Sequence, residues 1–153
     1  MIKELKKDNI VLELLTDEED NYILLEKWYQ EKEVYDNFEQ RKLSFGEIKK
    51  KYYPRTLEST NIPVYIIKYN DDKIGIIQYQ SIDDENKTIY NLNENILYEV
   101  DIFIGEIHYH NKGIGTTAIS LLVDYLFNYK NANKVVMCPL KSNKKAINCY
   151  KKC

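Results

Sequence analysis

Short apolar runs and helical periodicities alternate along the first half of the chain. Residues 10–15 form an apolar run that predicts a strand, and the acidic residues 17–20 suit the start of a helix. Leu24, Leu25 and Trp28 then recur at three- and four-residue spacing, which places them on one face of that helix. By default, a stripe of this kind packs in a core.

Turn signals divide the next segment into a helix and a hairpin. Ser44 and Glu47 have the spacing of a capping box, so a helix is expected to begin there and to stop before Pro54. Residues 64–69 and 73–79 are rich in β-branched and aromatic side chains, and an Asn-Asp-Asp turn separates them. These two runs predict an antiparallel hairpin.

The second half predicts a strand, a glycine-bearing turn and a helix, followed by a further strand and a last helix. The first strand is expected at 96–104, the amphipathic helix at 114–129 and the second strand at 134–137. Asn143 is placed to cap the last helix, which would continue through Tyr150.

The order of these elements indicates the fold class. Residues 81–95 are polar and acidic and show no apolar period, which predicts a mobile, functional loop. Because strands alternate with helices after a hairpin, the sequence predicts an α/β or α+β fold around one mixed sheet. With 153 residues, 44% of them hydrophobic, the chain suits a single domain over residues 1–153.

Charge and cysteine usage exclude several classes of protein. The formal net charge is −2, with 22 basic and 24 acidic side chains well mixed, so no broad basic surface is available for nucleic acid. No apolar run is long enough to span a membrane, and the lysine-rich residues 1–10 lack the apolar stretch of a signal peptide, which predicts a cytoplasmic protein. Cys138, Cys149 and Cys153 lack the spacing of a zinc or redox pair, so reduced thiols and no metal site are expected, and a catalytic cysteine is disfavoured.

The most informative stretch runs from His110 to Thr116, between a predicted strand and a predicted helix. Gly113 and Gly115 let the backbone approach a ligand closely, and the amide N–H groups of the helix start, with Lys112 beside them, favour a pyrophosphate. The stretch lacks the Gly-Lys-Ser/Thr of nucleoside-triphosphate loops and the third glycine of dinucleotide turns, so ATP and NAD are disfavoured. It predicts a phosphate-bearing cofactor, although a plain helix-initiating turn explains two glycines about as well.

The same stretch resembles the acyl-CoA-binding signature of GNAT N-acetyltransferases, which is usually Arg or Gln, two residues, then Gly-x-Gly or Gly-x-Ala. Residues 143–152 are similar to the second motif of this family, an Asn, a basic pair, Ala-Ile and a Tyr on the last helix. Residues 75–78, 100–105 and 112–116, with Trp28 in the first helix, resemble aminoglycoside 6'-N-acetyltransferases in particular. This resemblance covers nearly the whole chain.

The resemblance implies the GNAT fold, a central, mixed, mostly antiparallel sheet flanked by helices. It implies acetyl-CoA as the cofactor and an aminoglycoside antibiotic as the acceptor, acetylated at its 6'-amine by direct transfer in a ternary complex, with resistance as the result. The cofactor-binding residues that it implies are Ile102, Phe103, Ile104, His110, Asn111, Lys112, Gly113, Ile114, Gly115, Thr116, Asn143 and Ala146.

Asp101 and Tyr150 are the catalytic residues that the resemblance implies. Asp101 would lie on the central strand beside the thioester and accept a proton from the amine or hold the ammonium group, with Glu99 as the reserve. Tyr150 would face the coenzyme A sulfur and give the thiolate a proton. Without the resemblance, an acid alternating along a strand faces solvent, and the tyrosine packs in a core.

An anionic acceptor site is expected because aminoglycosides are polycations. Acidic residues in or beside the predicted loop suit such a substrate, although a solvated loop has the same composition. They are Asp83, Asp84, Glu85, Glu94 and Glu99. The full set of expected substrate-binding residues is Trp28, Gln78, Tyr79, Asp83, Asp84, Glu99 and Cys138.

Three departures from the family pattern bear on these expectations. His110 stands where the signature has Arg or Gln, so one phosphate contact is expected to be weaker. Cys138 stands where the resembling enzymes often have Asp, so one anionic contact to the acceptor is expected to be missing. The family usually continues beyond the position of Cys153 with Gly-Phe and two more strands, which leaves two alternatives: a fold without those two strands, or an incomplete chain.

Two other functions fit the same motifs. A GNAT enzyme that acetylates a protein N-terminus or a small polyamine would share the cofactor site and differ in the acceptor site. A non-catalytic acyl-CoA-binding module would bind the cofactor without turnover, although the pair of Asp101 and Tyr150 argues against it. For each of these functions a monomer or a homodimer is expected.

Overall fold

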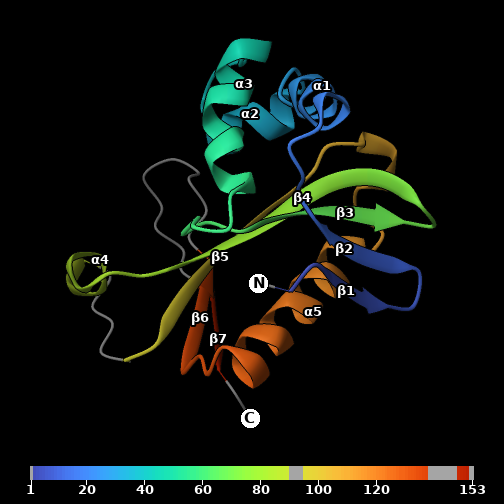
Figure 1. Ribbon diagram of the computed structural model, residues 1–153. Coiled ribbons are helices and arrows are strands. Elements are labelled where there is room, and N and C mark those ends of the chain that lie inside the picture. Colours follow the sequence, from blue (N-terminus) through green and yellow to red (C-terminus); the bar gives the residue numbers. More distant parts are fainter. Residues whose placement is uncertain (1, 90–94, 138–147, 152–153) are drawn as a thin grey trace.

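Seven strands form one sheet, in which the order across the sheet follows the order along the chain (Figure 1). The computed structural model describes residues 2–89, 95–137 and 148–151. The strands are β1 (Glu4–Lys7), β2 (Ile10–Leu14), β3 (Val64–Tyr69), β4 (Asp72–Ser81), β5 (Leu97–Ile104), β6 (Lys134–Met137) and β7 (Asn148–Lys151). The helices are α1 (Glu19–Trp28), α2 (Lys32–Phe38), α3 (Phe45–Tyr52), α4 (Asp84–Ile89) and α5 (Ile114–Tyr129), with the 3-10 helices η1 (Tyr53–Thr56) and η2 (Ile107–Tyr109).

The sheet is mixed and mostly antiparallel, which confirms the expected fold class. Among the described strands, only β5 and β6 pair in parallel, and their ladder joins residues 97–99 to residues 134–136. The rest of β5, residues 100–104, pairs with β4 alone among the described strands. One edge of β5 therefore leaves its neighbour partway along the strand.

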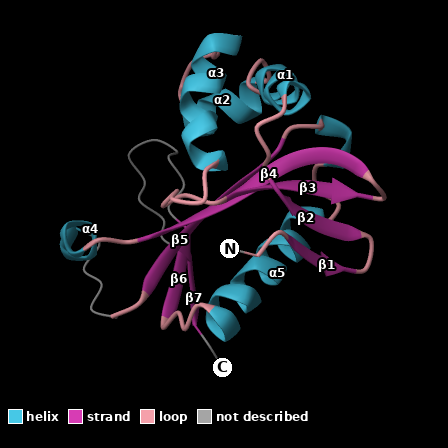
Figure 2. Cartoon of the chain, in the orientation of Figure 1, coloured by secondary structure: helices cyan, strands magenta, loops and turns pink. Residues whose placement is uncertain are grey.

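Helices cover both faces of the sheet, as Figure 2 shows for α5 on one side and α1 to α3 on the other. On the α5 face, Leu122 and Leu126 pack with Val100 and other strand residues. On the opposite face, Leu25 of α1 and Ile48 of α3 join a separate cluster that includes Phe103 of β5. No helix among the described residues is both long and apolar enough to cross a membrane.

Several elements are confirmed as the patterns predicted them. Ser44 Oγ accepts a hydrogen bond from the Glu47 N–H at 3.2 Å, and Glu47 Oε1 accepts one from the Ser44 N–H at 3.1 Å, which completes the capping box of α3. The helix ends at Tyr52, before Pro54. The β3–β4 hairpin, β5, α5 and β6 also form within one or two residues of the predicted bounds.

Three elements carry too little apolar signal to be predicted. In the edge strand β1, only Leu5 is apolar, and charged residues are common at exposed sheet edges. In α2, only Val34 is buried. The helix α4 lies inside the segment predicted as a loop, so that prediction is wrong for Asp84–Ile89; an ion pair of Lys87 with Asp84 at 3.5 Å supports the helix without an apolar stripe.

The predicted last helix is wrong at its C-terminal end. Residues Asn148–Lys151 form β7, which pairs antiparallel with β6 from Met137 opposite Asn148 to Lys134 opposite Lys151. This ladder gives the backbone of β6 a partner on its outer edge, and in so short a segment such pairing outweighs a weak helical period. The earlier part of that predicted helix, residues 143–147, lies outside the described residues.

Candidate active site

A row of polar side chains crosses β4 and β5 on the face covered by α1 to α3. In the β4–β5 ladder, Gln78 lies opposite Asp101 and Gln80 lies opposite Glu99. The apolar pair of Ile76 and Phe103 lies two residues further along the same ladder. Residues two apart on a strand share a face, so all four polar side chains point to the same side as Phe103. Gln80 Nε2 donates a hydrogen bond to Glu99 Oε2 at 3.4 Å. We call this row, with the cations that face it, the acceptor cluster.

Arg55 of η1 closes the acceptor cluster from the helical layer. Its Nη1 donates a hydrogen bond to Gln78 Oε1 at 2.9 Å, and its guanidinium carbon lies 5.3 Å from the centre of the Tyr52 ring. Gln78 is only 8% exposed, so its amide depends on protein partners for its hydrogen bonds. Together, the ring and the amide fix the guanidinium beside Asp101.

A second cation, Lys51, enters the cluster from α3. It forms an ion pair with Glu39 and lies 3.3 Å from the Tyr29 hydroxyl, to which it donates a hydrogen bond. The Tyr29 and Tyr52 hydroxyls are 2.6 Å apart within the buried aromatic layer. Burial lowers the pKa of the Lys51 ammonium, and burial raises the pKa values of both phenols above their usual range.

The two carboxyls of the cluster are harder to ionise than exposed ones. Burial raises the pKa of Asp101, while a hydrogen bond with Gln78 and the charges of Arg55 and Lys51 act in the opposite direction. Burial and the neighbouring charge of Asp101 raise the pKa of Glu99. A carboxylate with a raised pKa is a stronger base, which is the property required of a group that takes a proton from an amine.

The start of α5 forms a second polar region, which we call the cradle. Gly113 is the N-cap in the left-handed region at φ 77°, and no side chain caps the helix there. The first backbone N–H to bond back to Gly113 is that of Thr117, at 3.1 Å, so the N–H groups of the first turn are left for a ligand. The first turn carries no acidic residue. This arrangement fits a phosphate group.

The cradle adjoins the part of β5 that has left β6. A Cβ placed on Gly115 would lie 3.9 Å from the Ile102 side chain, so the helix start rests against this strand. His110 Nε2 lies 2.6 Å from the Ile104 carbonyl oxygen, which ties the loop before α5 to the end of β5. Among the described residues this edge of β5 has no strand partner, and such an edge beside an uncapped helix start fits a long cofactor that carries both amide and phosphate groups.

Gln78, Glu99 and Asp101 are brought together by the structure, but other predicted site residues are not. Tyr79 is 4% exposed and packs in the cluster on the α5 face, opposite to Gln78, so the structure does not bring these two side chains together, and contact of Tyr79 with a substrate stays a prediction. Phe103 packs its ring among aromatic residues under α1 to α3, and its backbone lies opposite Ile76 in the β4–β5 ladder, so its contact with a cofactor stays a prediction.

Trp28 occupies a core position. It is fully buried, its Nε1 donates a hydrogen bond to Glu106 Oε2 at 2.6 Å, and its ring lies against Gly105. A Cβ on Gly105 would lie 2.1 Å from the Trp28 ring, so glycine is required by this close approach. The default interpretation of the α1 stripe as core is confirmed, and contact of Trp28 with a substrate stays a prediction.

Two of the predicted acidic residues follow the end of β4. Asp83 and Asp84 are exposed at the start of α4, which Figure 1 places beyond the end of β4. Register pairs Ser81 with Tyr98, so Gln80 and Glu99 are the members of the acceptor cluster next to this end of β4, and Gln78 and Asp101 lie further along the strands. Cys138, Asn143, Ala146 and Glu94 lie outside the described residues, and of Tyr150 only its place in β7 is described.

Arg55, Lys51, Tyr52 and Glu39 were not predicted from the sequence. Their positions in η1, α3 and the loop after α2 carry no motif. The available signal was the capping box of α3 with Pro54 downstream, because together they place Lys51 and Tyr52 in the last turn of the helix and Arg55 just beyond it.

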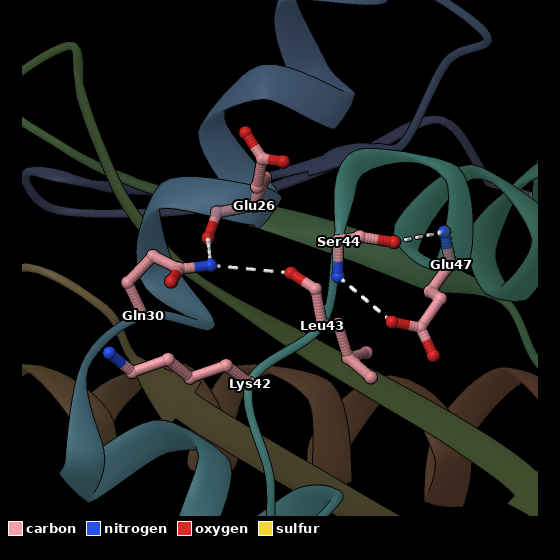
Figure 3. Close-up of a pocket in the computed structure, with 6 residues that line it drawn as sticks. All are labelled: Glu26, Gln30, Lys42, Leu43, Ser44 and Glu47. Atoms are coloured by element: carbon pink, nitrogen blue, oxygen red, sulfur yellow. Dashed lines mark hydrogen bonds between the residues drawn. The ribbon is translucent and has the colours of Figure 1, made fainter.

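A shallow depression of about 530 Å³ lies elsewhere, between the end of α1 and the start of α3 (Figure 3). It is lined by Glu26, Gln30, Lys42, Leu43, Ser44 and Glu47. Gln30 Nε2 donates hydrogen bonds to the carbonyl oxygens of Glu26 at 3.3 Å and Leu43 at 3.2 Å, and Ser44 and Glu47 satisfy each other. These contacts join two helices and share no residue with the acceptor cluster or the cradle.

Three features suit a phosphate-bearing cofactor beside a proton acceptor: the β5–β6 pair that separates partway along β5, the uncapped start of α5, and the half-buried Asp101 carboxyl. The sequence profile of the acetyltransferase (GNAT) domain matches residues 17–153. The chain therefore belongs to the GNAT acetyltransferase family.

Individual relatives agree with this family. The chain is 25% identical over 148 residues to aminoglycoside N(6')-acetyltransferase type 1 of Klebsiella pneumoniae, covering 95% of this chain and 73% of that protein. In fold it is similar to aminoglycoside acetyltransferase AAC(6')-Ib in complex with coenzyme A, with a TM-score of 0.67 and 20% identity over 88% of this chain and 76% of that one. It is also similar to RimL, a ribosomal L7/L12 alpha-N-protein acetyltransferase in complex with coenzyme A, with a TM-score of 0.69 and 13% identity over 92% and 76% of the two chains.

Proposed function

We propose that this protein transfers the acetyl group of acetyl-CoA to the 6'-amine of aminoglycoside antibiotics. The observation that carries the proposal is Asp101, a carboxyl with a raised pKa on the one strand that borders both the acceptor cluster and the cradle. The named relatives that acetylate aminoglycosides support the choice of acceptor.

The cradle is the proposed cofactor site. The N–H groups of Ile114, Gly115 and Thr116, with Lys112 before them, would hold the phosphates, and the edge of β5 that no described strand pairs with would hold the rest of the cofactor. When bound, acetyl-CoA supplies an acetyl group activated as a thioester. No described residue is required as a covalent nucleophile, because positioning of the two substrates supplies much of the acceleration.

Asp101 is the proposed proton acceptor, and Glu99 and Gln78 are proposed to contact the acceptor. An amine must lose a proton to form an amide, and a carboxylate of raised pKa accepts that proton more readily than an ordinary one. Tyr150 as the proton donor to the departing thiolate, and a cytoplasmic location, stay predictions of the sequence.

The charge of the acceptor cluster favours a second candidate acceptor. Arg55 and Lys51 lie among Glu39, Glu99 and Asp101, so cations offset much of the negative charge. A polycation gains less from such a site than from carboxylates alone, whereas the single amine of a protein N-terminus needs only one carboxylate. A peptide acceptor is therefore the alternative, and a polyamine is the control for charge alone.

Thiol release from acetyl-CoA tests the proposal. The protein is assayed with kanamycin, spermidine and a short unblocked peptide, and coenzyme A binding is measured separately by calorimetry. Turnover of kanamycin, lost with an analogue that has a hydroxyl at the 6' position, is the expected result. Turnover of the peptide alone would replace the proposed acceptor, and coenzyme A binding with no turnover of any amine would identify a non-catalytic binder.

A further inference from the structure

The direction of the hydrogen bonds around Gln78 indicates a role for Arg55, to which no function has been assigned above. Gln78 is buried and lies opposite Asp101 in the β4–β5 register. Arg55 only donates hydrogen bonds, so the end of the Gln78 side chain that faces it, at 2.9 Å, must be the amide oxygen. The amide NH₂ of Gln78 is then left for the Asp101 carboxylate, which only accepts.

The position of Arg55 is itself fixed. Its guanidinium lies over the Tyr52 ring at 5.3 Å from the ring centre, and the Tyr52 hydroxyl is held by the Tyr29 hydroxyl at 2.6 Å. The Tyr52 ring is fully buried, so this platform cannot move without disturbing the aromatic layer. Arg55 therefore presents one charge and one donor in a fixed place.

We propose that Arg55 is a positioning residue of the acceptor site, which sets the orientation of the Gln78 amide and supplies a positive charge that favours the ionised form of the half-buried Asp101 carboxyl. This inference rests on the proposed role of Asp101 as the proton acceptor. It concerns a residue outside every motif that indicated the function.

Other charged groups also face Asp101 and affect its ionisation. Glu99 on β5 opposes ionisation of Asp101, and Lys51 on α3 favours it. Glu39, after α2, forms an ion pair with Lys51, so Glu39 offsets part of the Lys51 charge that faces Asp101. Arg55 differs from Lys51 because it is bonded to the amide opposite Asp101, so its removal changes both the charge and the hydrogen-bond order.

The first test measures the pKa of Asp101 directly, without any acceptor. The carboxyl signals of ¹³C-labelled aspartate are titrated by NMR in the wild-type protein, and D101N assigns the signal. In R55Q the pKa of Asp101 is expected to rise by about one pH unit, since an opposite charge at close range lowers a carboxyl pKa by at least that much. R55K, which keeps the charge, is expected to stay near wild type.

The second test follows the pH profile of kcat/KM with whichever amine the wild-type protein acetylates. The acid limb is expected to move upward by about one pH unit in R55Q and to recover in R55K. R41Q is the matched control, because Arg41 is an exposed arginine that pairs with Glu47 away from the cluster, and it should keep the wild-type profile.

The outcomes separate this inference from the proposed function. An unchanged Asp101 pKa in R55Q overturns the inference, even if the enzyme acetylates aminoglycosides. A raised pKa supports it, even if the acceptor is another amine. If R55Q does not fold, Q78M removes the amide and leaves Arg55 in place. A raised Asp101 pKa in Q78M then supports the chain of hydrogen bonds from Arg55 through Gln78 to Asp101, and an unchanged pKa overturns the inference.

Discussion

The cradle and the acceptor cluster lie on either side of β5, yet they are built in different ways. The cradle consists of backbone: a glycine at φ 77° and the N–H groups of a helix that no side chain caps. The acceptor cluster consists of side chains that arrive from α3, η1, β4 and β5. A backbone site is fixed by local conformation, whereas a side-chain site depends on how distant elements pack.

The two regions also differ in their electrostatic cost. The N–H dipoles of the cradle are part of any helix start and bury no charge. In the cluster, burial raises the pKa of both Glu99 and Asp101, which means that folding disfavours the ionised forms that the proposed chemistry uses. Changes in the cluster should therefore affect turnover and stability together, and changes in the cradle should affect cofactor affinity alone.

The largest expected effect comes from replacing Asp101 with Asn. Asparagine keeps the shape but cannot accept the proton, so kcat should fall by about 10²–10⁴-fold, the range for loss of a general base. Coenzyme A affinity, measured by calorimetry, should not change, because the cradle is built from other residues. E99Q is the comparison and should lose less activity; equal losses in kcat and cofactor affinity for D101N would argue against a catalytic role.

The G105A substitution is expected to impair both regions at once. Its Cβ would lie 2.1 Å from the Trp28 ring, so the end of β5 must shift, at a cost of about 1–3 kcal/mol in the free energy of unfolding. Denaturant unfolding measures this loss. G46A is the matched control, since a Cβ there meets nothing within 4 Å. A stable G105A protein would show that β5 does not depend on the contact with Trp28.

The G115A substitution should act on the cradle alone. The added methyl would lie 3.9 Å from the Ile102 side chain, an ordinary contact, and alanine favours a helix, so stability should be unchanged or slightly higher. A methyl on the surface that faces the cofactor should nevertheless weaken coenzyme A binding by about tenfold, or about 1.4 kcal/mol. Calorimetric titration measures it, and wild-type affinity in a fully folded G115A would place the cofactor elsewhere.

The same contrast explains what could be predicted from the sequence. The glycines at 113 and 115 and the apolar period of α5 are local signals, so the cradle and its helix were predicted with the observed bounds. The partnership of Arg55 with Gln78 spans 23 residues and depends on where α3 meets the sheet, for which no local pattern exists. The strand period of two sets Tyr79 on the face opposite to Gln78, where it packs with the α5 side of the core.

The smallest effect tests the electrostatic cost of the cluster through the pH dependence of stability. Because the folded pKa of Asp101 is raised, its ionisation opposes folding: stability is highest below its unfolded pKa of about 3.9 and falls as pH rises through the folded value. D101N lacks this dependence, so the difference in unfolding free energy between D101N and wild type should grow in favour of D101N across that window.

E47Q provides a control of opposite sign. The hydrogen bond from Arg41 and that from the Ser44 backbone lower the pKa of Glu47 to about 2, so its ionised form contributes stability above its unfolded pKa, which is lost as pH falls toward 2. E47Q should therefore be less stable than wild type at neutral pH and approach it in acid. If D101N instead lost stability relative to wild type as pH rises, the ion pairing of Asp101 with Arg55 and Lys51 would outweigh its burial, and the cluster would be a stabilising network rather than a site whose charge opposes folding.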